Sequence, residues 1–279
     1  MKKTEKLKVN RLIENQIPGG NRHDRMPDLL DLQRFENKNI YYYKAVDSTN
    51  LVARKLAEEG ACAFSTVVAE EQKKGRGRLG RGWFSPRGTG LWFSMLLRPD
   101  DSGYFDASPS TLVTAAVLAD FLRTRFELPV QVKWPNDLLI GKKKFGGILT
   151  EIKAEFGRIN YLIVGIGLNI NQLETDFPAE IGQKSTSLLI ETGRLFNRTE
   201  LFLLIRDELE KAYRLFFAEG FSPFSRLWEK YNSTLGQTVT VCWPGGTMRG
   251  KALGLAKNGA LLLQDKDGDI HTVNYGELI

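Results

Sequence analysis

The sequence contains few of the residues from which disulfide scaffolds and metal centres are built. Among its 279 residues it has two cysteines, Cys62 and Cys242, and two histidines, His23 and His271. Two cysteines this far apart in sequence cannot form a disulfide framework or a four-cysteine zinc site, and they are typical of a reducing compartment. Two histidines also disfavour a metal centre with several imidazole ligands.

Long apolar stretches are absent as well. The sequence has no run of about 18 apolar residues, so it predicts no membrane-spanning helix. Its first residues are basic but lack the apolar segment of a secretory signal, and we therefore expect a cytoplasmic protein.

The composition is that of an ordinary globular protein with a moderate basic excess. Hydrophobic residues make up 42% and charged residues 26%, which excludes collagen-like, coiled-coil and wholly disordered chains. The 39 basic and 33 acidic side chains give a net charge of +6. Such an excess permits nucleotides, nucleic acid or an acidic protein surface as partners, without choosing among them.

The chain divides into three segments by pattern. Residues 1–38 are polar and interrupted by proline and glycine, and we interpret them as a partly disordered extension. Residues 39–233 mix helices with largely antiparallel strands, so the predicted class is α+β. Residues 234–279 contain short strands separated by frequent turn signals, which predicts a small β-barrel domain.

Within residues 39–233 the apolar spacing and the helix end signals predict individual elements. A helix should follow Asp47-Ser48-Thr49-Asn50 and end at Gly60. Further helices are predicted at 109–126, 199–218 and 223–231, and strands at 40–43, 66–72, 90–97, 130–133, 138–140, 147–152 and 161–167.

The most informative segment is residues 70–83, here called the arginine loop. Five cationic side chains and four glycines occur between Lys73 and Trp83. Glycines let a backbone approach a ligand closely and offer it N–H groups, and arginines match carboxylate and phosphate oxygens. This combination favours a binding loop for a small phosphorylated or carboxylated ligand.

Three other interpretations of the arginine loop are weaker. Gly75-x-Gly77-x-x-Gly80 matches a dinucleotide fingerprint, but that motif needs a helix directly after it, and a turn and a strand are predicted instead. Arginine–glycine segments that bind nucleic acid are usually repetitive tails, whereas this one is single and lies within a domain. The last alternative is a solvated basic loop without a ligand.

Two further clusters carry polar or bare-backbone surfaces. Lys133-Trp134-Pro135-Asn136-Asp137 joins two predicted strands, and Lys144 follows before Gly146-Gly147. Lysines there could neutralise charge in phosphoryl or adenylyl transfer, although a packing corner followed by a solvated lysine turn is an equal alternative. Gly165 and Gly167 alternate in a strand, which suggests close approach of a flat group or of another chain, or simply a crossing against a helix.

Taken in order, these stretches resemble biotin protein ligases. The matching residues are Asp47-Ser48-Thr49-Asn50, Gly75-Arg76-Gly77-Arg78-x-Gly80-Arg81-x-Trp83, Lys133-Trp134-Pro135-Asn136-Asp137, Lys144-x-Gly146-Gly147 and Gly165-x-Gly167-x-Asn169. The resemblance begins at about Tyr42 and extends to the end of the chain. It implies a catalytic domain like that of class II aminoacyl-tRNA synthetases with a small SH3-like C-terminal domain.

The resemblance also implies an activity and its substrates. Biotin would react with ATP to give biotinyl-5′-AMP and pyrophosphate, with Mg²⁺ as cofactor. The biotinyl group would then pass to a lysine of a biotin carboxyl carrier protein, with an acetyl-CoA carboxylase subunit as the family expectation. A homodimer is possible by the same resemblance, and no membrane partner is implied.

The site residues follow from the same resemblance. Lys144 and Arg78 would be catalytic. The biotin site would contain Ser48, Thr49, Asn50, Gln72, Gly75, Arg76, Gly77, Arg78, Lys144 and Gly147. The ATP and adenylate site would contain Arg78, Arg81, Trp83, Lys133, Asn136, Lys144 and Asn169. Asp137 is assigned only as a supporting or metal-site residue.

Departures from relatives narrow the interpretation. Some biotin ligases carry an N-terminal helix-turn-helix, but residues 1–38 hold too few apolar side chains for a three-helix core, so we predict no operator binding. Lipoate ligases run similar chemistry, but their His-Asp signature is missing because no histidine lies between His23 and His271. A regulator that binds biotinyl-AMP without ligating is a further alternative, which the presence of both Arg78 and Lys144 disfavours.

Overall fold

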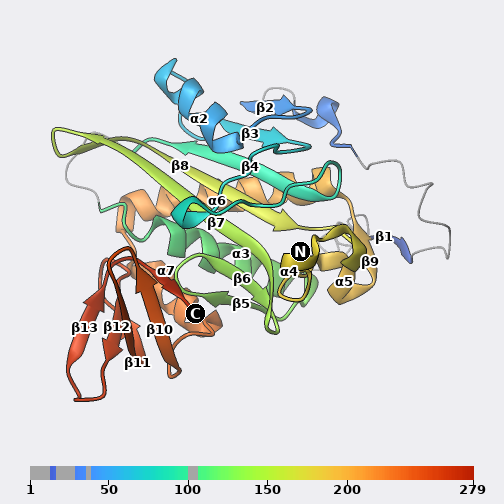
Figure 1. Ribbon diagram of the computed structural model, residues 1–279. Helices are drawn as coiled ribbons and strands as arrows, with labels where there is room; N and C mark the ends of the chain where they lie inside the picture. Colours follow the sequence, from blue (N-terminus) through green and yellow to red (C-terminus); the bar gives the residue numbers. More distant parts are fainter. Residues whose placement is uncertain (1–12, 17–28, 36–38, 100–105) are drawn as a thin grey trace. The chain divides into compact units, whose positions relative to one another are not determined.

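The structure, a computed structural model, describes residues 13–16, 29–35, 39–99 and 106–279 (Figure 1). It divides into two compact units. Unit 1 comprises residues 1–99 and 142–207, and unit 2 comprises residues 100–141 and 208–279. Most of the predicted extension, residues 1–38, lies outside the described residues. That part of the prediction is therefore untested.

Unit 1 is built on strands in the order β2-β3-β4-β8-β7. Their bounds are β2 Ile40–Tyr43, β3 Thr66–Ala69, β4 Gly90–Leu97, β7 Lys143–Glu155 and β8 Arg158–Asn169. Only β2 and β3 pair in parallel, and the other neighbours are antiparallel. This agrees with the predicted α+β class.

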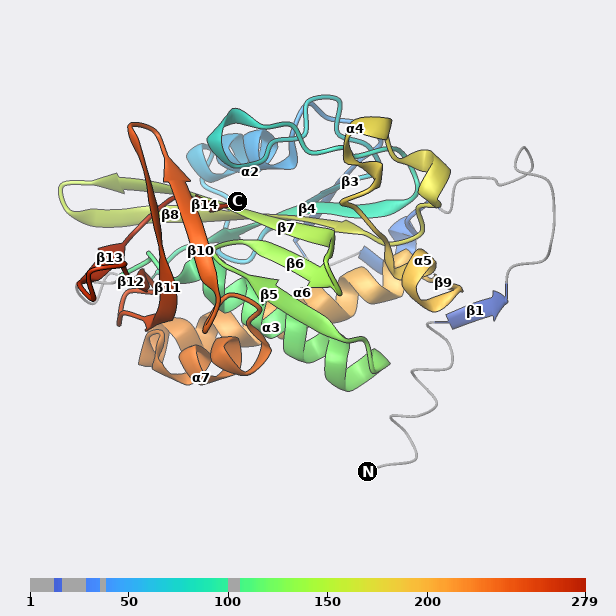
Figure 2. The same ribbon diagram turned by 60° about the horizontal axis from the view of Figure 1, so that its bottom comes forward.

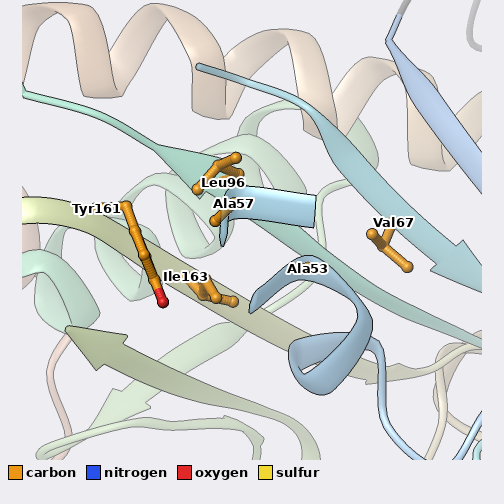
Figure 3. Close-up of a cluster of buried hydrophobic side chains, with 6 residues drawn as sticks. All are labelled: Ala53, Ala57, Val67, Leu96, Tyr161 and Ile163. Carbon is orange, nitrogen blue, oxygen red and sulfur yellow. The ribbon is translucent and has the colours of Figure 1, made fainter. Parts of the chain in front are cut away.

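Helix α2 (Thr49–Glu58) covers one face of this sheet. Figure 3 shows its inner residues Ala53 and Ala57 against Val67 of β3, Leu96 of β4 and Ile163 of β8. All of these side chains are nearly inaccessible to solvent, so their burial fixes α2 on the sheet through the hydrophobic effect. The predicted helix after Asn50 is confirmed, and Gly60 follows it with φ +88°.

Strands β7 and β8 are longer than their apolar runs predict. They continue as an exposed hairpin whose two turn residues, Phe156 and Gly157, both have positive φ. This pair of dihedrals suits a tight two-residue hairpin turn. The residues near the turn are largely charged, so the sequence shows no apolar pattern there. Backbone pairing rather than burial stabilises this part of the two strands.

Several short elements of unit 1 lie outside the predicted set. They are β1 (Ile13–Gln16), which pairs with β9 (Arg194–Phe196), the 3₁₀ helices η3 (Arg78–Gly80) and η4 (Glu174–Asp176), and the helices α4 (Ala179–Gly182) and α5 (Leu188–Thr192). The 3₁₀ helix η2 (Leu32–Phe35) overlaps the one short helix that the spacing of Leu29, Leu30 and Leu32 suggests. Helices of four or five residues give no periodic apolar signal, so the sequence pattern does not reveal them.

Unit 2 contains a helical layer and a hairpin. Helices α3 (Ser110–Phe126) and α7 (Ser222–Tyr231) pack side by side (Figure 2), and both contact β5 (Val130–Lys133), which pairs with β6 (Asp137–Ile140). The Tyr231 hydroxyl donates to Asp120 of α3 at 2.7 Å. Helix α6 (Arg198–Glu219) begins in unit 1 and ends in unit 2. These helices match the predicted ones within one residue at each end.

The C-terminal part of unit 2 is a separate antiparallel sheet with the strand order β13-β12-β11-β10-β14. Its strands are β10 Thr238–Trp243, β11 Gly246–Leu255, β12 Leu261–Gln264, β13 Ile270–Val273 and β14 Glu277–Leu278. Gly245, Gly259 and Gly268 have positive φ in the connecting turns, as their turn signals predict. Within the described residues, every helix falls short of the combined length and hydropathy that a transmembrane span requires.

Candidate active site

The arginine loop in unit 1 folds back on itself. The Gln72 N–H donates to the Ser85 carbonyl at 3.2 Å, and the Trp83 N–H donates to the Gly75 carbonyl at 2.9 Å. The tip of the loop is reached at Leu79 and Gly80, which both have positive φ. A ladder of backbone hydrogen bonds therefore gives this glycine-rich segment a defined path.

The three arginines of the loop differ in exposure. Arg76 and Arg81 are exposed, whereas Arg78 is half-buried at the start of η3. Of the three, Arg78 therefore has the most restricted surroundings, which suits a side chain that holds a ligand.

A polar cluster lies where α2 begins. Thr49 donates from both its N–H and its hydroxyl to Gln72 Oε1, at 2.9 and 3.1 Å. Ser94 on β4 donates to Asn50 Oδ1 at 2.6 Å, and its hydroxyl lies 2.7 Å from that of Thr49. Ser48 is also buried and stands at the N-cap position without a side-chain cap hydrogen bond. Four of these polar side chains are thus held in one place by mutual hydrogen bonds.

The orientation of the Asn50 amide is set from the other side. Its Nδ2 donates to Glu151 Oε2 at 2.9 Å and to the Leu149 carbonyl at 3.3 Å. Arg54 forms an ion pair with the same Glu151 at 2.8 Å. Because both neighbours of Nδ2 only accept, Asn50 must direct its oxygen toward Ser94.

Three glycines provide the bare-backbone surface of the site. A Cβ on Gly165 would overlap the Asn50 amide, and one on Gly167 would overlap the Trp83 indole. A Cβ on Gly147 would lie 3.0 Å from the same indole. At Gly167 the flat group that the glycine pattern suggested is the Trp83 indole of the arginine loop. At Gly165 the close neighbour is Asn50 of helix α2, as the alternative of a crossing against a helix predicts.

The Trp83 indole contacts Lys144, one of the two catalytic candidates. The Lys144 Nζ lies 5.1 Å from the ring centroid, a cation–π arrangement. The indole N–H is buried and has no hydrogen-bond acceptor among the residues that the structure describes. A buried donor of this kind costs free energy unless a bound group supplies an acceptor.

The backbone of Lys144 is fixed by a distant segment of unit 1. Its N–H donates to the Lys184 carbonyl at 2.8 Å, and its carbonyl accepts from Thr186 N–H at 3.0 Å. Asn169 at the end of β8 donates to the Thr186 carbonyl at 3.0 Å and accepts from Gln172 at 3.2 Å. Asn169 is thereby linked to the strand that carries Lys144.

Comparison with known proteins identifies the relatives of this chain. The profile described as the biotin/lipoate A/B protein ligase family matches residues 42–169, and that of the biotin protein ligase C terminal domain matches residues 234–279. The bifunctional ligase/repressor BirA of Bacillus subtilis is 38% identical over 232 residues, which cover 83% of this chain and 71% of that protein. The chain belongs to the biotin protein ligase family.

Further relatives support this assignment. The biotin--[acetyl-CoA-carboxylase] ligase of Paracoccus denitrificans is 31% identical over 80% of this chain and 92% of that protein. The structure of the Aquifex aeolicus biotin protein ligase in complex with biotin and ATP has a TM-score of 0.73 at 35% identity, covering 87% of this chain and 98% of that one. The predicted family, fold class and enzyme class, an ATP-dependent biotin ligase, are confirmed.

Unit 1 of this family member holds most of the predicted site residues. Those on or around the arginine loop and the start of α2 are Ser48, Thr49, Asn50, Gln72, Gly75, Arg76, Gly77, Arg78, Arg81 and Trp83, and those on β7 and β8 are Lys144, Gly147 and Asn169. Contacts with Trp83 join the loop to Gly147 and Lys144. Asn169 contacts Thr186 and Gln172 instead.

The other three predicted residues lie in unit 2, between β5 and β6. Asn136 is buried, and Lys133 and Asp137 are half-buried register partners at the ends of the hairpin. The Lys133 Nζ donates to the Leu278 carbonyl of the C-terminal sheet at 2.9 Å. Trp134, the residue after Lys133, is buried. Its backbone N–H donates to Thr234 Oγ1, and its indole N–H donates to the Gly259 carbonyl. The packing-corner alternative thus describes Trp134 correctly.

Three polar residues that contact the predicted site residues were not predicted from the sequence. Ser94 and Glu151 contact Asn50, and Ser85 accepts from Gln72 Nε2 at 2.9 Å. Glu151 offers a weak signal, because it is a charged residue within the mainly apolar predicted strand 147–152. Ser85 and Ser94 carry none, since a serine in a strand or loop is common and its partner is distant in sequence.

A metal ion would find few protein ligands here. The described residues contain no group of three or more His, Cys, Asp or Glu side chains that could hold one. Mg²⁺ does not need such a cage, because it is usually bound by one or two carboxylates together with substrate phosphates. A single carboxylate such as Asp137 therefore fits the predicted Mg²⁺.

Proposed function

We propose that this chain activates biotin with ATP as biotinyl-5′-AMP and transfers the biotinyl group to one lysine of a biotin carboxyl carrier domain of acetyl-CoA carboxylase. The family assignment and the printed names of the relatives support this acceptor. The observation that carries the proposal is the Lys144 ammonium above Trp83, beside the glycine surface and the polar cluster at the start of α2.

The polar cluster suits the head of biotin. A ureido ring carries two N–H donors and one carbonyl acceptor, so it needs both kinds of partner in fixed positions. Ser48, Thr49, Asn50 and Gln72 supply these hydroxyls and amides. Hydrogen bonds with Ser94 and Glu151 hold Thr49 and Asn50 in place before a ligand binds, and Gln72 is held by Thr49 and Ser85. Preorganised polar groups lose little freedom on binding and therefore favour affinity.

In the first half-reaction a biotin carboxylate oxygen attacks the α-phosphorus of ATP. The new P–O bond forms as the bond to the β-phosphate oxygen breaks, and pyrophosphate leaves. Two anionic groups must meet in this step, so a cation between them lowers the barrier. Lys144 takes this role, and Arg78 binds the carboxylate and phosphate oxygens.

In the second half-reaction the neutral ε-amine of the acceptor lysine attacks the carbonyl carbon of the mixed anhydride. An amide bond forms, the C–O bond to AMP breaks, and the amine proton is lost to water. The arginine loop, with Gly75, Arg76 and Gly77 along the ligand and Trp83 over the adenylate, shields the anhydride from hydrolysis. Arg81 binds the ATP phosphates.

The remaining residues serve the nucleotide. As the family resemblance implies, Lys133, Asn136 and Asn169 would contact ATP. Asp137 would hold Mg²⁺, which would neutralise charge at the phosphates. Since Lys133 and Asn169 already have protein partners, part of their effect is to hold the neighbouring backbone.

The broader assignments belong to the same proposal. Residues 39–233 form the catalytic domain and residues 234–279 the SH3-like C-terminal domain. The enzyme works in the cytoplasm without a membrane or DNA partner, and a homodimer is compatible with it.

The test is biotin-dependent exchange of pyrophosphate into ATP by purified protein with Mg²⁺. Exchange with biotin, and none with lipoate or octanoate, supports the proposal. Exchange with lipoate would move the chain to the lipoate branch of the family. Saturable binding of biotinyl-AMP without any exchange would favour a regulator instead.

A further inference from the structure

A fully buried ion pair lies at the base of the arginine loop. Glu70, the first residue of the loop, and Arg198, the first residue of α6, both have 0% exposed side chains. Arg198 Nη2 lies 2.9 Å from Glu70 Oε2, and Arg198 Nη1 donates to the Gly90 carbonyl at 2.9 Å. Gly90 begins β4, the strand to which the loop returns. One guanidinium therefore contacts both ends of the chain segment that contains the loop.

The backbone reinforces this closure. The Gly88 N–H donates to the Glu70 carbonyl at 3.3 Å, and the Glu70 N–H donates to the Tyr43 carbonyl of β2 at 3.0 Å. A forked, planar cation is suited to holding two acceptors at a fixed separation. Loss of either contact would free one end of the loop and raise the entropy cost of ordering it around a ligand.

The N-terminal segment 29–35 completes the carboxylate's surroundings. The Leu30 N–H donates to Glu70 Oε1 at 2.6 Å, and the Tyr42 hydroxyl donates to the same oxygen at 3.4 Å. Burial raises the pKa of Tyr42, and the negative charge of Glu70 raises it further.

Segment 29–35 is also attached to α6. The Asp31 N–H donates to Thr199 Oγ1 at 2.8 Å, and the buried Phe35 ring lies edge-on to Phe202 with 5.4 Å between centroids. The part of the chain interpreted from sequence as an extension thus packs on the same helix that supplies Arg198.

We propose that Glu70 and Arg198, together with the Leu30 N–H, are positioning residues that fix both ends of the arginine loop for biotinyl-AMP retention. The proposal rests on the proposed function only for its ligand, since the closure of the loop is a property of the free protein. It assigns a role to residues 29–35, which sequence interpretation left without one.

The test uses the full chain and a pair of substitutions that leaves no buried charge. Removing one partner of a buried ion pair strands the other charge, so a single variant can simply fail to fold. The double variant Glu70→Gln/Arg198→Met removes both charges at similar volume. Tyr213→Phe, which loses buried hydrogen bonds to Ser110 and Thr114 in unit 2, serves as a control for general destabilisation.

Two readouts separate loop positioning from stability. Trypsin cleavage at Arg76, Arg78 or Arg81 is measured in ligand-free protein, with each variant held the same number of degrees below its own Tm. Cleavage should be at least about tenfold faster in the double variant than in Tyr213→Phe. The bound biotinyl-AMP should escape about tenfold faster, with a raised KM for biotin and little change in kcat. Cleavage and retention equal to those of the Tyr213→Phe control would overturn the proposal.

The contribution of the N-terminal segment has its own matched pair. Leu30→Pro and Leu30→Ala both remove the leucine side chain, but only the proline lacks the N–H that bonds to Glu70. Faster loop cleavage in Leu30→Pro alone supports the role of this hydrogen bond, and equal cleavage in both variants contradicts it. If wild-type protein shows no biotin-dependent exchange, the proposed function fails. The cleavage experiment still tests whether Glu70 and Arg198 fix the ends of the arginine loop.

Discussion

The Lys144 ammonium lies 5.1 Å from the centre of the Trp83 ring, which itself rests on the glycine backbone of β7 and β8. A residue of the arginine loop and a residue of a distant strand thus form one surface. This contact connects the arginine loop with the separate stretch Lys144-x-Gly146-Gly147. It also places the cation next to a ring that a nucleotide or biotin could stack against.

Replacing Lys144 tests the chemical step. Lys144→Ala should reduce biotin-dependent pyrophosphate exchange by about 10²–10³-fold, because one preorganised cation at developing charge is lost. The unfolding midpoint should stay near that of wild type, since the Lys144 backbone keeps its bonds to Lys184 and Thr186. Lys142→Ala, an exposed neighbour, is the control and should retain activity. Full exchange by Lys144→Ala would remove Lys144 from the mechanism.

Arg78 can be tested through the stability of the intermediate. A charge-assisted hydrogen bond contributes about 1.5–3 kcal/mol, so Arg78→Ala should speed release of biotinyl-AMP by about 10–150-fold. Rapid filtration after a single turnover measures this release. The exposed loop residue Lys73 provides the control variant Lys73→Ala, which should release the adenylate at the wild-type rate. Identical release from both variants would contradict the role of Arg78.

The acidity of Tyr42 offers a test that needs no substrate. Its pKa is raised by burial and by Glu70, so its contribution to stability is present below the pKa of an unfolded tyrosine and is lost as pH rises through the folded value. Alkaline difference titration of wild type against Tyr42→Phe should show one phenol ionising later than an ordinary tyrosine. The difference is needed because burial also raises the pKa of Tyr161 and Tyr213. An ordinary titration of Tyr42 would argue against its contact with the charged Glu70.

The main elements of the fold could be predicted from sequence because their signals are local. Strand β4 has the predicted bounds, and α3, α6 and α7 begin or end at residues marked by proline, threonine or glycine. The ends of β7 and β8 near Phe156 could not be predicted. There the two strands are held by pairing with each other, which leaves no apolar pattern in the sequence. Local signals therefore find long elements that carry an apolar pattern and miss exposed strand ends and very short helices.

The site shows the same division between local and distant information. The glycines and arginines of the loop are dense enough to be recognised, but their partners are not. Glu151 orients Asn50 across 101 positions, and Arg198 reaches Glu70 across 128. Neither pairing leaves a pattern in a single sequence, because hydrogen bonds between distant strands and helices depend on the complete fold.

The glycine surface under Trp83 gives the most direct test of the site geometry. In Gly167→Ala the new methyl group would overlap the indole, so the ring must leave its position or the strand must shift. Overpacking of this kind costs about 1–3 kcal/mol where the neighbour cannot move, but a loop residue can move and thereby lose its contact with Lys144. We expect a small change in Tm, altered tryptophan fluorescence and strongly reduced exchange with biotin. Gly254→Ala, at a strand glycine with open space and no positive φ, should change none of the three. Wild-type exchange by Gly167→Ala would mean that the catalytic arrangement does not require Trp83 to rest on β8.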